Sequence, residues 1–160
     1  LIAQNWTQTR YFQGRPSANP GGANNAMTSG ASNAGPTSLQ LVEEVEERVA
    51  DLKEANPDAE GAVPQDLVTA SASGLDPHIS PEAALWQAPR VARARGVERE
   101  AVERLVRACT EKPAMGLLGA PRVNVLRLNL ELDRLHPVKE AAPVKKAPKK
   151  PRRQRGRRRQ

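Results

Sequence analysis

The side chains best suited to chemistry lie in one short stretch, which contains Ser71, Ser73, Asp76 and His78. Serine, histidine and aspartate are the groups that an activated hydroxyl nucleophile requires. In a working triad the carboxylate and the nucleophile contact opposite sides of the imidazole, and residues this close in sequence seldom reach that arrangement. The Gly-x-Ser-x-Gly turn of one large hydrolase class does not occur in the sequence. We therefore expect no catalytic residue here and interpret the stretch as a turn.

The sequence also contains few groups that could bind a metal ion or a nucleotide. His78 and His136 are the only histidines and Cys109 is the only cysteine, so the clustered ligands of a zinc site are missing. The sequence contains no Gly-rich loop followed by Lys and Ser or Thr, which would cradle the phosphates of a nucleotide. We expect no metal and no cofactor in this chain. Cys109 is expected to be a buried, inert thiol.

The net charge of +7 conceals two parts of opposite sign. Residues 137–160, the basic tail, hold eleven Lys and Arg against the single acid Glu140 and so carry +10, which leaves −3 for residues 1–136. We expect the basic tail to be disordered, because its like charges repel one another. Such a segment attracts anionic lipid or nucleic acid, but it has no aromatic residue for base stacking.

Residues 1–136 are predicted to form one small domain of mixed α and β structure, with about three helices and a few short strands. Residues 1–37 are rich in Gly, Asn and Ser and indicate a long loop. Trp6, Tyr11 and Phe12 should pin this loop to the domain, because a free linker would not need such apolar anchors. No stretch approaches the roughly 18 apolar residues of a membrane-spanning helix.

The first predicted helix spans residues 37–56. Thr37 and Gln40 fit a capping box, in which each side chain bonds the other residue's backbone donor. Apolar residues then recur at helical spacing on one face. Asn56 should end the helix, because the proline that follows disfavours a helical residue before it.

Two further helices are predicted over residues 80–96 and 98–112. Ser80 is the expected cap of the first, with proline at the first helical position, where its missing donor costs nothing. Pro89 predicts a kink or a break inside this helix, before Gly96 ends it. Cys109 should lie on the buried face of the later helix.

Two strands are predicted from short apolar runs. Residues 63–70 combine apolar and β-branched side chains, which is typical of a buried strand. Residues 122–132 alternate apolar and polar side chains, which predicts a half-buried strand with four leucines on one face. A helix capped by asparagine from Asn129 onward is the competing assignment.

Several of these stretches, in this order, resemble the motifs of one family: residues 10–18, 29–36, 66–81, 90–96 and 121–130. The family is the C subunit of the bacterial high-affinity potassium-transporting P-type ATPase, the Kdp-type complex. The resemblance covers the chain from about Leu1 to Asp133, and the basic tail lies outside it. Several long motifs in a shared order are far more specific than one short motif.

The resemblance implies an accessory subunit without a catalytic site of its own. It implies a membrane helix upstream of Leu1 and a soluble domain, residues 1–136, on the extracytoplasmic side of the bacterial cytoplasmic membrane. The implied partners are the A, B and F subunits of the pump, with docking on the A subunit. ATP, magnesium and potassium would be handled by the complex. The implied role is assembly or stabilisation, with a proposed action as a catalytic chaperone for ATP binding by the B subunit.

The residues expected to dock the domain or to stabilise it lie in three of the motifs. They are Gly14, Arg15, Pro16, Ser17, Ser73, Gly74, Asp76, Pro77, His78, Arg122 and Asn124. The alternative function is a protein that binds nucleic acid or anionic lipid through its basic tail. Of these two ligands we expect the tail to touch anionic lipid rather than nucleic acid.

Overall fold

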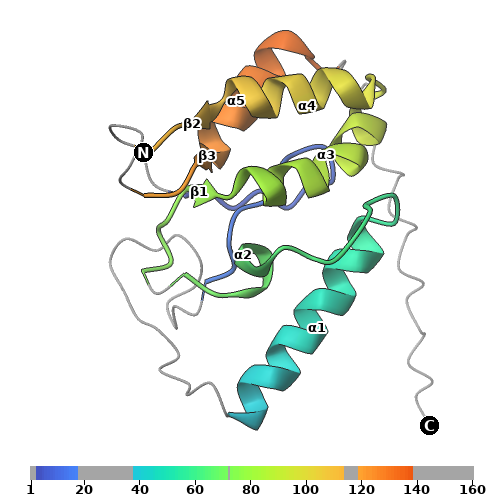
Figure 1. The fold of residues 1–160 in the computed structure, drawn as a ribbon. Coiled ribbons are helices and arrows are strands. Elements are labelled where there is room, and N and C mark those ends of the chain that lie inside the picture. Colours follow the sequence, from blue (N-terminus) through green and yellow to red (C-terminus); the bar gives the residue numbers. More distant parts are fainter. Residues whose placement is uncertain (1–2, 18–37, 72, 114–118, 139–160) are drawn as a thin grey trace, which may run out of the picture.

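Five helices and three short strands form the part of the chain that this computed structural model describes, which is residues 3–17, 38–71, 73–113 and 119–138. In chain order they are α1 (Leu39–Ala55), α2 (Gln65–Val68), β1 (His78–Ile79), α3 (Pro81–Arg95), α4 (Arg99–Ala108), β2 (Thr110–Glu111), β3 (Arg122–Asn124) and α5 (Val125–Leu135). The predicted mixture of α and β structure is confirmed. In Figure 1, α3 lies between the α4–α5 pair and α2, and α1 stands beyond α2.

The three strands form a small antiparallel sheet in the order β1-β3-β2. His78 lies opposite Asn124, and Thr110 lies opposite Val123. Because β3 is the central strand, it pairs with segments that are distant in sequence. His78 of β1, for example, precedes its partner Asn124 by more than 40 residues. The sheet therefore joins the start of α3, the end of α4 and the start of α5.

α3 is the most buried helix and organises the core. The side chain of Ser80 accepts a hydrogen bond from the amide of Ala83 at 3.0 Å, and Gly96 ends the helix at a φ of 65°, so both predicted ends are confirmed. The predicted break at Pro89 is wrong, since the helix continues through it. Buried side chains on both sides of Pro89 pack into the core, and this packing offsets the missing backbone donor.

Residues 63–70 do not form the predicted strand. Gln65–Val68 make the single helical turn α2, in which the amide of Thr69 bonds the carbonyl of Gln65 at 3.0 Å. Leu67 and Val68 are buried from this turn. A short apolar run suits a buried turn of helix as well as a buried strand, and periodicity alone does not separate the two.

The strand predicted over residues 122–132 ends at Asn124, where α5 begins. Asn124 accepts a hydrogen bond from the amide of Arg127 at 3.0 Å, so the asparagine cap lies five positions before the one predicted at Asn129. The four leucines do not share a face, because Leu128 is fully buried and Leu130 is 55% exposed. Leu128 and Leu132, spaced by four, face the core instead.

α1 is only partly packed, and none of its residues is fully buried. Gln40 bonds Glu44 at 3.1 Å instead of forming the predicted capping box, and the side chain of Ser38 makes no capping bond. Thr37 lies outside the described residues. The predicted end is confirmed, because both the backbone and the side-chain nitrogen of Asn56 donate to the carbonyl of Leu52.

α4 stops at Ala108, earlier than predicted, because Thr110 and Glu111 pair with β3. Cys109 is half-buried at this end and packs against the core, so the predicted full burial is wrong. Burial nevertheless raises the pKa of the Cys109 thiol. None of the helices in the described residues is long and apolar enough to cross a membrane.

The N-terminal loop is pinned to the domain by its aromatic residues, as predicted. Phe12 is fully buried, and the hydroxyl of Tyr11 donates to Asp133 at 3.0 Å. The ring of Trp6 lies 4.5 Å from that of Tyr11. Residues 18–37 of the predicted loop and residues 139–160 of the basic tail lie outside the described residues, so the disorder of the tail stays a prediction.

Candidate functional site

The predicted docking residues converge around an open pocket of about 370 Å³. Four of them line it, namely Arg15, Asp76, His78 and Arg122. They come from the N-terminal loop, the segment before α3 and strand β3. Three motifs that are distant in sequence therefore form one surface.

Asp76 links two of these motifs. Its Oδ1 accepts a hydrogen bond from the amide of His78 at 3.0 Å and lies 3.1 Å from Nδ1 of the same residue. Its Oδ2 forms an ion pair with Nη1 of Arg15 at 3.3 Å. The predicted turn is confirmed, because the Asp76 carboxylate closes it onto the His78 backbone.

The N-terminal motif is tied to the segment before α3 by further bonds. Nη2 of Arg15 donates to the carbonyls of Thr69 and Ala70, each at 3.4 Å. The amide of Ser71 donates to the carbonyl of Pro16 at 2.8 Å, and Ser17 pairs with Ser71 in a parallel bridge. These contacts hold the motif in one place on the domain.

Ser73 and Gly74 shape the tight turn ahead of Asp76. The hydroxyl of Ser73 accepts from the amide of Leu75 at 3.2 Å and lies 3.4 Å from the hydroxyl of Ser71. Gly74 has a φ of 66°, in the left-handed region that favours glycine. Among the described hydrogen bonds, none joins a serine hydroxyl to His78, whose ring contacts Asp76 instead.

Arg122 and Asn124 take different roles on β3. Asn124 is buried and caps α5, whereas the side chain of Arg122 is 60% exposed and pairs with Glu111 at 3.2 Å. The carbonyl of Pro77 accepts from the amide of Val125 at 2.9 Å and fixes the start of α5. Gly14 has an ordinary φ and open space around its Cα, so nothing in its surroundings requires glycine.

Asp66 is the residue of this surface that sequence reasoning missed. Its carboxylate accepts from the amide of Ser80 at 2.7 Å and from the hydroxyl of Ser80 at 3.1 Å. The two residues are fourteen positions apart, so no local pattern connects them. Only the fold brings the acid of α2 to the cap of α3.

Replacing Ser80 by alanine is expected to lower the free energy of unfolding by about 1–2 kcal/mol. The change removes the cap of α3 and one bond to Asp66. Urea unfolding measures the loss. Ser38→Ala is the matched control, because Ser38 precedes α1 without a capping bond, and its effect should stay below about 0.5 kcal/mol. Equal losses in both variants would contradict this role.

Most charged groups on this surface are bonded to neighbouring groups of the same surface. Arg15, Asp76 and His78 are engaged with one another, and Asp66 is engaged with Ser80. In the described ranges, no three His, Cys, Asp or Glu side chains lie close enough together to hold a metal ion. The surface is therefore a fixed polar face with its charges largely paired.

Comparison with known proteins places the chain in a family. The profile of KdpC, described as the K+-transporting ATPase c chain, matches residues 1–134. The potassium-transporting ATPase KdpC subunit of Cronobacter sakazakii is 55% identical over 137 residues, which is 86% of this chain and 72% of that protein. The KdpC subunit of Myxococcus xanthus is 56% identical over 144 residues, which is 89% of this chain and 68% of that protein. The resemblance of the motifs is confirmed, and the chain belongs to the KdpC family, the C chains of potassium-transporting ATPases.

Proposed function

We propose that this chain is an accessory subunit of a potassium-transporting ATPase that helps the pump to assemble and to stay assembled, without a catalytic site of its own. Its partners are the A, B and F subunits, and the A subunit is the one on which the domain docks. The domain acts on the extracytoplasmic side of the bacterial cytoplasmic membrane. Family membership at 55% identity supports this proposal, since the relative is itself a pump subunit.

The observation that carries the docking role is one polar surface, the docking face, which is formed by Arg15, Asp66, Asp76, His78 and Arg122. The ion pair of Arg15 with Asp76 joins two of its chain segments, and backbone bonds join the third, β3, so docking would cost little additional ordering. Arg122 is held on a strand, yet its side chain is 60% exposed. An exposed guanidinium beside a polar surface suits recognition of a carboxylate or carbonyl on another subunit.

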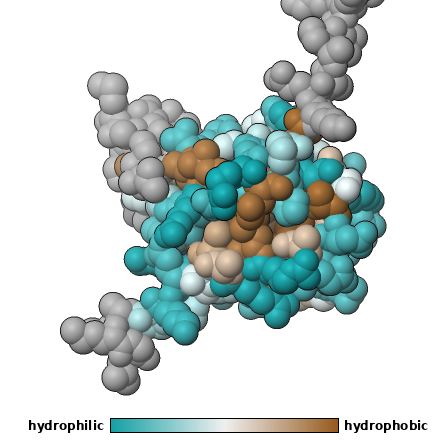
Figure 2. Space-filling model, turned by 90° about the horizontal axis from the view of Figure 1, so that it is seen from above, coloured by the Kyte–Doolittle hydropathy of each residue, from teal (hydrophilic) through white to brown (hydrophobic). Residues whose placement is uncertain are grey.

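An exposed apolar area also supports a partner-binding role. Leu130 and Leu135 of α5 are 55% and 48% exposed. Figure 2 shows apolar surface gathered within a polar rim on the end of the molecule that carries α4 and α5. Apolar patches with polar rims are typical of interaction surfaces.

Arg122→Glu is expected to weaken association with the other pump subunits by roughly tenfold, because it reverses the exposed charge of the docking face. Copurification of tagged, co-expressed chain with those subunits, at graded salt, measures the effect. Arg93→Glu is the control, since Arg93 is also 60% exposed and also paired with an acid, Asp58. Failure of the unaltered chain to copurify would overturn the proposal, and equal losses in both variants would remove Arg122 from the docking face.

The finer predictions of the sequence remain predictions. These are a contribution to ATP binding by the B subunit, the handling of ATP, magnesium and potassium by the other subunits, and contact of the basic tail with anionic lipid. The alternative of nucleic-acid binding through the tail also stays untested, and a steep loss of binding with salt would be its signature.

A further inference from the structure

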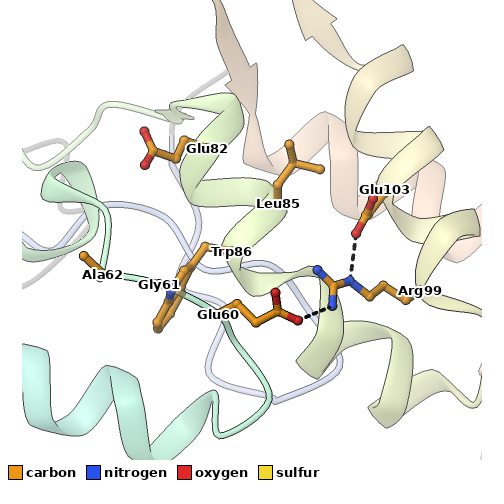
Figure 3. A pocket seen from close by; sticks show the side chains of 8 residues that line it. All are labelled: Glu60, Gly61, Ala62, Glu82, Leu85, Trp86, Arg99 and Glu103. Carbon is orange, nitrogen blue, oxygen red and sulfur yellow. Dashed lines mark hydrogen bonds and ion pairs between the residues drawn. The ribbon is translucent and has the colours of Figure 1, made fainter.

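A second pocket, of about 530 Å³, lies between the loop at residues 60–62 and helices α3 and α4. It shares no lining residue with the docking face. Leu85 and Trp86 of α3 give it apolar surface, and Figure 3 shows charged side chains around them from both helices and the loop. The pocket thus combines apolar and charged groups outside the surface discussed above.

The charged groups of this pocket leave an excess of negative charge. Arg99 pairs with Glu103 at 2.8 Å and with Glu60 at 3.3 Å (Figure 3). The hydrogen bond from Arg99 lowers the pKa of Glu103, so this carboxylate stays ionised. Glu82 also lines the pocket, and no ion pair of Glu82 is found within the described ranges. Glu103 also pairs with Arg107 at 3.1 Å, so three carboxylates face two guanidinium groups and the net charge is −1.

Trp86 lines the wall of this pocket beside the loop at residues 60–62. Trp86 is only 8% exposed, and its indole nitrogen has no hydrogen-bond partner in the part of the chain that the structure describes. Figure 3 shows the indole beside Gly61, whose Cα faces open space. Because this nitrogen is enclosed by the protein, Trp86 offers a ligand the apolar surface of its ring, and its N–H resonance can report on what binds beside it.

A basic peptide carries groups that complement this pocket. Its Lys or Arg side chains can pair with Glu60 and Glu82. The alkyl stems of those side chains can cover Leu85 and the indole ring. We propose that this pocket binds a peptide rich in Lys and Arg, and that its occupant is the chain's own segment 145–159.

Charge and reach favour the chain's own segment over a foreign one. Residues 145–159 hold ten Lys and Arg and no acid, whereas the charged groups of the pocket carry a net negative charge. The seven residues from Val138 to Lys145 span at most about 25 Å, and the fifteen that follow add roughly 50 Å. A domain of this size has a radius of gyration of about 14 Å, so the segment can reach any of its faces. Covalent attachment also gives it an effective concentration on the millimolar order.

The test follows the indole N–H resonance of Trp86 by NMR, assigned with a Trp6→Phe variant. We expect this resonance to differ between the 160-residue chain and a chain ending at Val138. A synthetic peptide of residues 145–159 should shift it saturably in the shorter chain, and more weakly in the full chain, where the attached segment already competes.

Glu60→Gln with Glu82→Gln should weaken peptide binding by about tenfold, because two ion pairs are lost. The control, Glu47→Gln with Glu54→Gln, removes the same charge from the exposed side of α1 and should change binding less than about twofold. Identical resonances in the two chains, or equal weakening by both pairs of substitutions, would overturn the proposal.

Two further outcomes would assign the pocket or the tail differently. Equal peptide affinity for the full and the shortened chain would mean that the pocket is free, so its occupant would belong to a partner. Binding of the full chain to phosphatidylglycerol vesicles, with the Trp86 resonance unchanged by removal of the tail, would assign the tail to lipid instead. Either result contradicts the occupancy proposed here.

Discussion

Replacing Arg90 by methionine is expected to lower the free energy of unfolding by about 3–5 kcal/mol. Arg90 is only 2% exposed, and its guanidinium donates to Asn56 Oδ1 at 2.7 Å and to Gln87 Oε1 at 2.8 Å. It also donates to the carbonyls of Thr9 and Tyr11, the latter at 3.0 Å. Methionine would fill much of the space but donate to none of these oxygens. Asn56 Oδ1 and the two carbonyls would lose the guanidinium donor, whereas Gln87 Oε1 would keep the amide of Gln13 at 2.9 Å.

The cost is large because every described partner of Arg90 is a neutral oxygen. Burial lowers the pKa of Arg90 to about 10, which is still well above neutral pH, so the guanidinium enters the core charged. Only its hydrogen bonds compensate for the lost hydration. They also tie α3 to the N-terminal loop and to the end of α1.

Urea unfolding of Arg90→Met measures this prediction against Arg93→Met on the same helix. Arg93 is 60% exposed and pairs with the exposed Asp58, so its replacement should cost less than about 1 kcal/mol. Arg90→Lys keeps the charge, but one ammonium cannot serve four separate acceptors, so it should rank between the other two. Similar stability in all three variants would contradict the role assigned to Arg90.

The sequence predicts those features of the fold that neighbouring residues decide. The helix from Ser80 to Gly96 is an example, since a serine before proline caps its start and a glycine in the left-handed region ends it. Asn56 before Pro57 ends α1 for the same kind of reason. Such signals depend on residues within about one turn of the chain, so they can be recognised without knowledge of the rest of the fold.

Predictions fail where a distant partner decides the structure. Leucines two apart, as in Leu126 to Leu132, predict a strand, yet the same run contains Leu128 and Leu132 at helical spacing. The cap at Asn124 and the packing of α5 on α4 stabilise the helix instead of the strand. α4 likewise ends early because residues 110–111 pair with β3.

The docking face shows the same division. The motif resemblance identified Arg15, Asp76 and Arg122. The bond between Arg15 and Asp76 joins residues 61 positions apart, and the pairing of β3 with β1 brings Arg122 to them. Asp66 was missed because its partner Ser80 lies in another element. The buried role of Arg90 was also missed, because this residue was predicted only as part of a motif. A charged residue among the apolar positions of α3 indicates a buried polar network.

Replacing Asn129 by leucine is expected to lower the free energy of unfolding by about 2–4 kcal/mol, and to release the N-terminal loop before the rest of the domain. Asn129 is fully buried in α5. Its Oδ1 accepts from the amide of Phe12 at 2.9 Å, and its Nδ2 donates to the carbonyl of Phe12 at 3.0 Å. Leucine has nearly the same size but can form neither bond.

Hydrogen exchange at the Phe12 amide separates this role from general packing. In the unaltered chain this amide should exchange slowly, and in Asn129→Leu it should lose protection more than the amides of α3 do. Leu130→Asn is the control, because it exchanges the same two residue types at the next position, where the side chain is 55% exposed. It should change the free energy of unfolding by less than about 0.5 kcal/mol. If Asn129→Leu destabilised the domain while Phe12 kept its protection relative to α3, the other contacts of the loop, such as the Phe12 ring and the bonds from Arg90, would be enough to hold it. Asn129 would then act only on α5 itself.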